Sequence, residues 1–192
     1  MLRGVDYTKI DKLSLEFLND YELYNFPLNV FKIATEILNA KIIYYSSLNN
    51  KQLEFIKTKR VLDKGYTIVE HLSNGTIRHV IYINDSTCQA RQKYTIAHEI
   101  KHILYGEEVY NKDEEILADY FAKILLAPKC LIIDNKWLSQ EEISSKFGLS
   151  LESARYHLNG IKNRIGSYGF ELFDYERNYI NKYCEFNKIK RG

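Results

Sequence analysis

The stretch Tyr94-Thr95-Ile96-Ala97-His98-Glu99-Ile100-Lys101-His102-Ile103-Leu104-Tyr105 places two histidines four positions apart among mainly apolar residues. Residues at positions i and i+4 of a helix lie on the same face, about one turn apart. The apolar positions indicate that one side of this helix is buried. We therefore predict a helix from the N-capping run Asp85-Ser86-Thr87 to about Tyr105, with Gly106 just after its end and both histidines at the wall of a cleft.

His98 and His102 are spaced so that both imidazoles can reach one Zn²⁺ at about 2.0–2.1 Å. Glu99 projects from an adjoining angle, so it is better placed to hold a water beside the metal than to bind the metal itself. A carboxylate in that position acts as the general base of metal-assisted hydrolysis. The motif thus predicts two metal ligands and one catalytic residue on a single helix.

The next predicted helix, from Asp113 to about Ala127, offers a third ligand. Glu115 and Asp119 are again four positions apart and share a face. Because a catalytic zinc site has three protein ligands and one open position, we expect Glu115 to bind the metal. We expect Asp119 to accept the Nδ1–H of a ligand histidine, which fixes its tautomer. Two alternatives stay open: Glu114 as the ligand, and Glu115 and Asp119 as ordinary surface acids.

The residue that would stabilise a reaction oxyanion is not assigned by the sequence. The candidates are three tyrosines around the two predicted helices and one histidine of a predicted strand, namely Tyr94, Tyr105, Tyr110 and His79. We otherwise expect His71, His79 and His157 to be structural or surface residues.

Residues 66–83 alternate between apolar and polar side chains, which is typical of strands. The two alternating runs flank Asn74-Gly75, a dipeptide favoured in two-residue hairpin turns because both positions tolerate positive φ. We therefore predict an antiparallel hairpin over 66–83.

The remaining segments give an order of helices, then strands, then helices, which is typical of an α+β protein. Helices are predicted over residues 6–24, from Pro27 to Leu38, over 142–147 and from Ser150 to about Ile161, with a short strand over 42–45; residues 48–64 are ambiguous. Ser139 and Glu142 form a capping-box pattern, and Gly148 suits a turn. We expect the basic stretch after Arg177 to be a partly frayed tail.

The composition excludes several classes of protein. The 192 residues carry a net charge of +2, which is too small to indicate nucleic-acid binding by itself. No apolar run approaches the roughly 18 residues of a membrane helix, and the first residues lack the apolar core of a signal peptide. Three cysteines without CxxC spacing, which we expect to be buried thiols, predict a cytoplasmic protein.

Three blocks of the sequence resemble the ImmA/IrrE family of zinc metallopeptidases. The family pattern is basic-x-basic-aromatic-Thr-x-Ala-His-Glu-x-x-His, then Glu-x-x-Ala-Asn/Asp-x-Phe-Ala, then Leu-Leu-x-Pro. The corresponding runs here are Arg91–His102, Glu115–Ala122 and Leu125–Pro128. The resemblance extends upstream to Phe26–Val30 and downstream to Ser139–Ser150, and so covers roughly residues 25–165.

Two positions depart from the family pattern. Lys101 stands where the family usually has Gly, and Ala127 where Met is common. Neither position is a ligand, so the departures leave the predicted chemistry intact. We expect Lys101 to alter the rim of the cleft or the substrate preference.

The resemblance implies a small zincin-like α+β domain over 1–128, followed by a helical, helix-turn-helix-like segment and basic tail over 129–192. It implies one catalytic Zn²⁺ bound by His98, His102 and Glu115. It also implies that Glu99 takes a proton from the water that attacks the peptide carbonyl and later returns it.

By the same resemblance, the expected activity is an endopeptidase that cleaves a partner protein. The expected partner is a helix-turn-helix repressor encoded nearby, whose cleavage would induce genes of a mobile element or a stress response. The predicted strand residues Ile77, His79, Ile81 and Ile83 would offer an exposed edge for an extended substrate.

Two other functions stay open. Residues 139–165 would suit a DNA-binding or protein-binding transcriptional regulator with a vestigial metal site, although basic residues exceed acidic ones there by only one. The same zinc chemistry acting on a different target would make the chain the toxin of a toxin–antitoxin-like pair.

Overall fold

The computed structural model describes residues 7–58, 65–105 and 112–189. These residues belong to two compact units. One unit spans Asn29–Ala122, and the other combines the residues up to Leu28 with those from Lys123 onward. Of the expectations above, Gly106 and Tyr110 lie outside the described residues.

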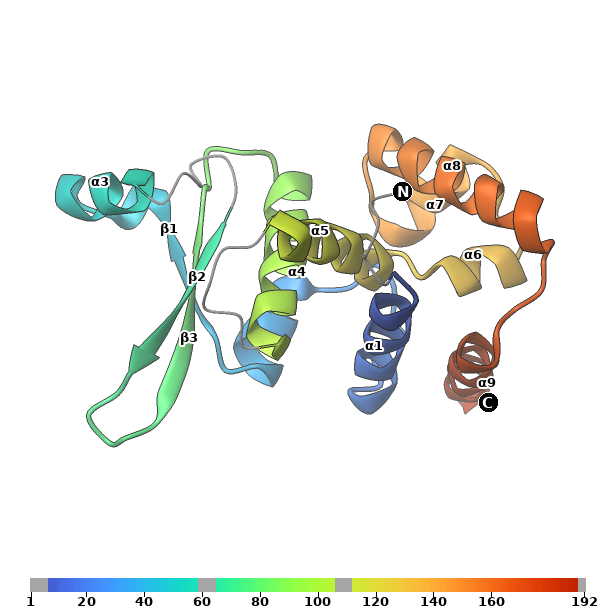
Figure 1. Ribbon diagram of the computed structural model, residues 1–192, viewed down its shortest axis with the longest axis horizontal. Helices are drawn as coiled ribbons and strands as arrows, with labels where there is room; N and C mark the ends of the chain where they lie inside the picture. Colours follow the sequence, from blue (N-terminus) through green and yellow to red (C-terminus); the bar gives the residue numbers. More distant parts are fainter. Residues whose placement is uncertain (1–6, 59–64, 106–111, 190–192) are drawn as a thin grey trace. The chain divides into compact units, whose positions relative to one another are not determined.

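A three-stranded mixed sheet forms the base of the unit Asn29–Ala122 (Figure 1). Its strands are β1 (Lys41–Tyr44), β2 (Tyr66–His71) and β3 (Ile77–Ile83), in the spatial order β1-β3-β2. β2 and β3 pair antiparallel, and β1 joins β3 in parallel. The sheet and the many helices confirm the predicted α+β class.

The position of β3 corrects the prediction that Ile77, His79, Ile81 and Ile83 form an exposed strand edge. β3 pairs with β2 along Ile77–Tyr82 and with β1 along Val80–Ile83, so it is the central strand. Alternation along one strand indicates a half-buried face, but it carries no information about which strands lie on either side. The outer strand of the hairpin is β2.

The hairpin itself is confirmed, whereas its turn differs from the expected two-residue type. Leu72 and Thr76 still pair, since the N–H of Leu72 donates to the carbonyl of Thr76 over 2.8 Å. Gly75 has φ 81, and its N–H donates to the carbonyl of Leu72 over 3.0 Å. Asn74 instead accepts a hydrogen bond from the Thr76 hydroxyl through its side chain, so only Gly75 needs the left-handed conformation.

α4 (Gln89–Tyr105) lies against the face of the sheet that carries Ile81 and Ile83 of β3. α2 (Val30–Lys32) contacts α4 and continues as the π-helical turn η1 (Ile33–Ile37), which contacts β1, whereas α5 (Lys112–Leu126) is joined to α4. Ile81 and Ile83 of β3 are fully buried, as are Ile96 and Ile100 of α4, which packs on β2 and β3. This apolar contact fixes α4, and with it the histidine motif, against the sheet.

Two local expectations are corrected in this unit, and one ambiguous segment is assigned. The helix predicted to open at Pro27 begins at Val30, because the side chain of Asn29 accepts from the N–H of Lys32 and caps it there. Within the ambiguous residues 48–64 lies the helix α3 (Asn50–Thr58), and the 3₁₀ turn η2 (Tyr45–Ser47) precedes it. Cys88 is exposed rather than buried.

The second unit is helical in its described residues. Its helices are α1 (Tyr7–Asp20), α6 (Lys129–Asp134), α7 (Gln140–Phe147), α8 (Leu151–Tyr168) and α9 (Asp174–Ile189). The capping box of Ser139 and Glu142 is present at the start of α7, and Gly148 ends α7 with φ 64. The tail expected to fray is helical to Ile189, since α9 packs on α1 and α6.

Two further expectations concern this unit and the chain as a whole. Cys184 is exposed, so only Cys130 of the three thiols is buried. The unit boundaries place the residues up to Leu28 with the C-terminal helices, whereas the predicted boundary at residue 128 placed them with the metal motif. Which segments fold independently stays a prediction. Within the described ranges, no helix has both the length and the apolar character needed to span a membrane.

His157 of α8 gives the helical unit a measurable pH dependence. Its Nε2–H donates to the carbonyl of Ala127 over 2.7 Å, and burial lowers the pKa of His157 from 6.5 to about 4. The neutral ring is therefore the folded form. Its contribution to stability is complete above pH 6.5 and is lost as the pH falls from 6.5 toward 4.

The quantity to follow is the free energy of unfolding of the wild type minus that of His157→Gln. We expect this difference to fall by about 2 kcal/mol when the pH is lowered from about 7.5 to 5. Urea unfolding measures these free energies. It can be followed by the fluorescence of Trp137, the single tryptophan, which lies in the same structural unit as His157. Parallel pH profiles for the two proteins would show that His157 does not titrate on unfolding.

Candidate metal centre

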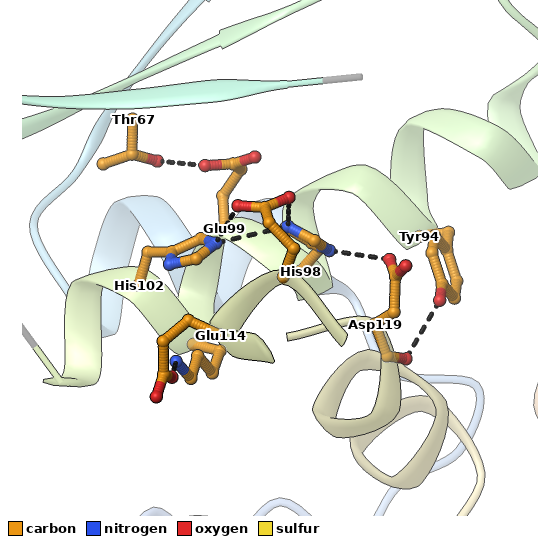
Figure 2. Close-up of polar contacts among 9 residues, drawn as sticks. Thr67, Tyr94, His98, Glu99, His102, Glu114 and Asp119 are labelled. Atoms are coloured by element: carbon orange, nitrogen blue, oxygen red, sulfur yellow. Dashed lines mark hydrogen bonds and ion pairs between the residues drawn. The ribbon is translucent and has the colours of Figure 1, made fainter. Parts of the chain in front are cut away.

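The two histidines of α4 lie side by side at the site (Figure 2). Their Nε2 atoms are 3.2 Å apart, and the His98 ring is almost completely buried. One helical turn separates the two residues, as their spacing predicts. Both imidazoles therefore point a nitrogen at the same place.

Glu115 of α5 completes a group of three ligand atoms. Its Oε2 lies 3.4 Å from Nε2 of His98, and its Oε1 lies 3.4 Å from Nε2 of His102. Ligand atoms about 2.0 Å from a tetrahedral metal ion are about 3.3 Å from one another. The distances are close to that spacing, although Glu115 approaches the two histidines through different oxygens, and one ligand atom from each residue lies within 4.8 Å of the others. Two imidazole nitrogens and one carboxylate therefore fit a divalent metal ion here.

Asp119, one turn after Glu115, orients His98. Its Oδ1 lies 2.9 Å from Nδ1 of His98, as the sequence predicted for a hydrogen bond that fixes the tautomer. With the proton on Nδ1, the lone pair of Nε2 faces the ligand position. Tyr94 holds Asp119 in turn, because its hydroxyl donates to the Asp119 carbonyl over 2.9 Å.

The charges around these ligands favour a cation. Burial alone would lower the pKa of His98, but the hydrogen bonds with Asp119 and Glu115 and the nearby carboxylates raise it from 6.5 to about 9. Hydrogen bonds from His102 and His98 hold the pKa of Glu115 far below its ordinary value. The position among them therefore attracts positive charge, either a proton or a metal ion.

Glu99 is buried beside the ligands, near the start of β2. Thr67 of β2 donates its hydroxyl proton to Oε2 of Glu99 over 2.7 Å. Burial raises the pKa of Glu99, while the positive charges of His98 and His102 and this hydrogen bond oppose the rise. A carboxylate in such surroundings is a stronger base than one in water.

Gly65 and Thr67 were missed by sequence reasoning. A Cβ on Gly65 would lie 2.5 Å from Cγ2 of Thr95 and 3.1 Å from Oε1 of Glu99, so only glycine fits there. Thr67 pairs with Ile81, whose side chain faces the helices, and cross-strand partners project from the same face. The register of the hairpin would have been needed to predict this contact.

The oxyanion candidates occupy different surroundings. Tyr94 is bonded to the backbone of α5, and the ring of Tyr105 lies 5.9 Å from Nζ of Lys101. His79 has a buried Nδ1 without a hydrogen-bond partner among the described residues. Tyr45, which sequence reasoning did not single out, is buried, and its burial and the charge of Glu99 raise its pKa to about 12.

Lys101 corrects one expectation, and the position of Glu114 bears on the alternative left open for the third ligand. Lys101 is 1% exposed and contacts Oε2 of Glu114, so it does not form the rim of a cleft. Glu114, the alternative ligand, faces Lys101, whereas Glu115 faces the histidines. The structure therefore brings Glu115, rather than Glu114, to the ligand group.

Comparison with known proteins identifies one family. The family described as IrrE N-terminal-like domain, a peptidase family, matches residues 43–159, which is more than half of the chain. No curated protein and no solved structure matches the chain. The matched range contains all the ligand candidates together with Glu99 and Thr67.

Asp119→Asn tests the orienting hydrogen bond. The amide lacks the carboxylate charge that makes the His98 ring a stronger ligand, and when its nitrogen faces His98 it also lacks the acceptor for the Nδ1–H. We therefore expect the affinity for Zn²⁺ to fall by about 10- to 100-fold. Competition with a chromogenic chelator measures this affinity on the metal-free protein. Glu36→Gln, which changes an exposed acid of the same unit, is the control. Equal affinities for wild type and Asp119→Asn would exclude the assigned role.

Proposed function

The chain belongs to the IrrE N-terminal-like domain family of peptidases, and from this premise we propose that it is a zinc-dependent endopeptidase that cleaves a partner protein. The observation that carries the proposal is the group of His98, His102 and Glu115, whose ligand atoms lie within 4.8 Å of one another. Glu99 lies beside this group, in reach of Thr67. Ligands and base together are what metal-assisted hydrolysis requires.

Zinc suits the ligands because two imidazoles and one carboxylate form a common catalytic zinc set that leaves a fourth position open. When bound, the metal would polarise the peptide carbonyl and lower the pKa of water. His98, His102 and Glu115 would hold it. Asp119 would keep the Nε2 lone pair of His98 available by accepting the proton on Nδ1.

Glu99 is the proposed general base and acid. It takes a proton from the attacking water and returns it to the leaving nitrogen. Thr67 holds one carboxylate oxygen, Oε2, and thereby limits rotation of the carboxylate. Burial makes the carboxylate a stronger base, which supports the first of the two proton transfers.

We place the substrate along the outer edge of β2 rather than along β3. β2 pairs with β3 on one side only among the described strands, and Thr67 brings this strand to Glu99. An extended peptide paired with β2 would run past the general base. This placement replaces the strand edge that the sequence suggested.

The substrate is proposed to be a helix-turn-helix repressor encoded near this protein, cleaved in the cytoplasm so that repressed genes of a mobile element or a stress response are induced. Membership of a peptidase family supports a protein substrate. The resemblance to ImmA/IrrE metallopeptidases supports the choice of a repressor. A toxin acting on another protein target would use the same residues, so the identity of the cleaved protein separates these two functions.

DNA binding by the helices α7 and α8 is the weaker alternative. The pair has the turn at Gly148 that a helix-turn-helix needs. However, Arg164 pairs with Glu176 over 2.6 Å and is mostly buried. The exposed charges over 139–165 are then three basic and three acidic residues: Lys146, Arg155, Lys162, Glu141, Glu142 and Glu152. Such a balance offers little attraction to phosphates.

Glu99→Gln tests the proposed mechanism. The variant should retain zinc, because Glu99 is not a ligand, and should lose cleavage by at least about 100-fold, because the amide cannot accept the proton. The measurement is mass spectrometry of a neighbouring repressor after co-expression with the wild type, Glu99→Gln or the control Glu36→Gln. Wild-type cleavage by Glu99→Gln would refute the assigned role of Glu99.

Single prolines in β2 test the proposed substrate edge. Successive N–H groups of a strand point to opposite sides, so one of Ile68→Pro and Val69→Pro removes an outward donor and the other a donor to β3. The outward variant should fold and cleave the repressor more slowly. Unchanged cleavage by a folded variant with an outward proline would argue against β2 as the docking strand.

A further inference from the structure

Glu115 occupies a position that needs support from outside its own helix. It is the fourth residue of α5, which begins at Lys112. The first turn of a helix has N–H groups without intrahelical partners, and helix ends fray. A metal ligand in this turn keeps its place only if other contacts fix the start of the helix.

Two non-ligand side chains of α4 hold α5 on either side of Glu115. Tyr94 bonds the carbonyl of Asp119, one turn after the ligand. Lys101 contacts the carboxylate of Glu114, directly before the ligand. The two contacts bracket Glu115 in the sequence, and both join α5 to the helix that carries the histidines.

The contact of Lys101 with Glu114 is difficult to break. The Lys101 side chain is 2% exposed, and that of Glu114 is 30% exposed. Separating the two would take a buried ammonium away from this carboxylate, which is unfavourable. The ammonium also lies 5.9 Å from the ring centre of Tyr105, which adds a weaker attraction.

We propose that Lys101 is a positioning residue for the third metal ligand: its ion pair with Glu114 holds the first turn of α5 so that Glu115 faces His98 and His102. The inference rests on the proposed metal-dependent function. The contact of Lys101 with Glu114 is the link through which it acts on the ligand. Because Glu114 and Glu115 are adjacent, fixing the first restricts the second.

Metal affinity distinguishes this role from simple packing. A lysine that only fills space would change the stability of the metal-free protein without a selective effect on the metal. If Lys101 positions Glu115, replacing Lys101 lowers the affinity for the metal, because Glu115 must then become ordered when the metal binds. The Lys32–Glu36 pair of the same unit is exposed, with 62% exposure of each side chain, and provides a matched control.

The experiment measures Zn²⁺ affinity of the full-length, metal-free protein by competition with a chromogenic chelator. The variants are Lys101→Met, Glu114→Gln, the double variant, Lys101→Arg and the control Lys32→Met. We expect Lys101→Met and Glu114→Gln each to weaken zinc binding by about tenfold or more, and Lys32→Met to leave it within about twofold. Lys101→Arg, which keeps a cation, should restore most of the affinity.

The double variant tests whether the two residues act as a pair. Its zinc affinity should resemble that of the single variant that binds zinc less tightly, because the second substitution removes a contact that is already lost. The visible spectrum of bound Co²⁺ should also change in Lys101→Met, since it reports the number and arrangement of ligands. If Lys101→Met does not fold, Glu114→Gln, which retains an oxygen acceptor, carries the same test.

Folded Lys101→Met or Glu114→Gln with wild-type zinc affinity and an unchanged Co²⁺ spectrum would overturn the positioning role and leave the proposed function in place. Independent, additive effects of the two substitutions would overturn the pairing with Glu114. A wild-type protein that binds no zinc would instead overturn the proposed function, and the inference with it.

Discussion

Three ligand atoms from two helices lie within 4.8 Å of one another, and this closeness depends on the contacts of α4 with α5 and with the sheet. α4 supplies two of them on one face, so their spacing is a local property of the helix. The third comes from the first turn of α5. Its position depends on contacts between the helices, which include those of Tyr94, Lys101 and the Asp119–His98 pair.

The sheet provides the second half of the site. α4 packs on β2 and β3 through fully buried isoleucines, which brings Glu99 close to the start of β2. That closeness requires glycine at position 65 and gives Thr67 a carboxylate to bond. The ligands therefore depend on the contact of α4 with α5, whereas the base depends on the contact of α4 with the sheet.

Sequence alone could predict those features that depend on short separations along the chain. The helix spacing of His98 and His102, the second spacing of Glu115 and Asp119, and the capping box at Ser139 are all of this kind. Apart from the approach of Glu115 and Asp119 to the histidines, which the motif itself suggested, several features set by distant segments were missed or wrong. Lys101 was assigned to the rim of a cleft because its partner Glu114, on another helix, was not known.

The prediction that β3 has an exposed edge was wrong because the edge depends on a strand from another part of the chain. Alternation in β3 is real, but β1 comes from a distant part of the chain and covers the edge that was expected to be free. Thr67 escaped notice because its partner Glu99 is 32 residues away. The start of the second helix at Val30 was a smaller error, since Asn29 rather than Pro27 supplies the cap.

The central claim is that His98, His102 and Glu115 bind one metal ion. The most direct measurement is the zinc content per protein chain, by elemental analysis, of wild type and Glu115→Ala purified without chelators. The account predicts close to one equivalent in the wild type and a clear loss in the variant. A folded wild type without metal, or equal zinc in both proteins, would contradict it.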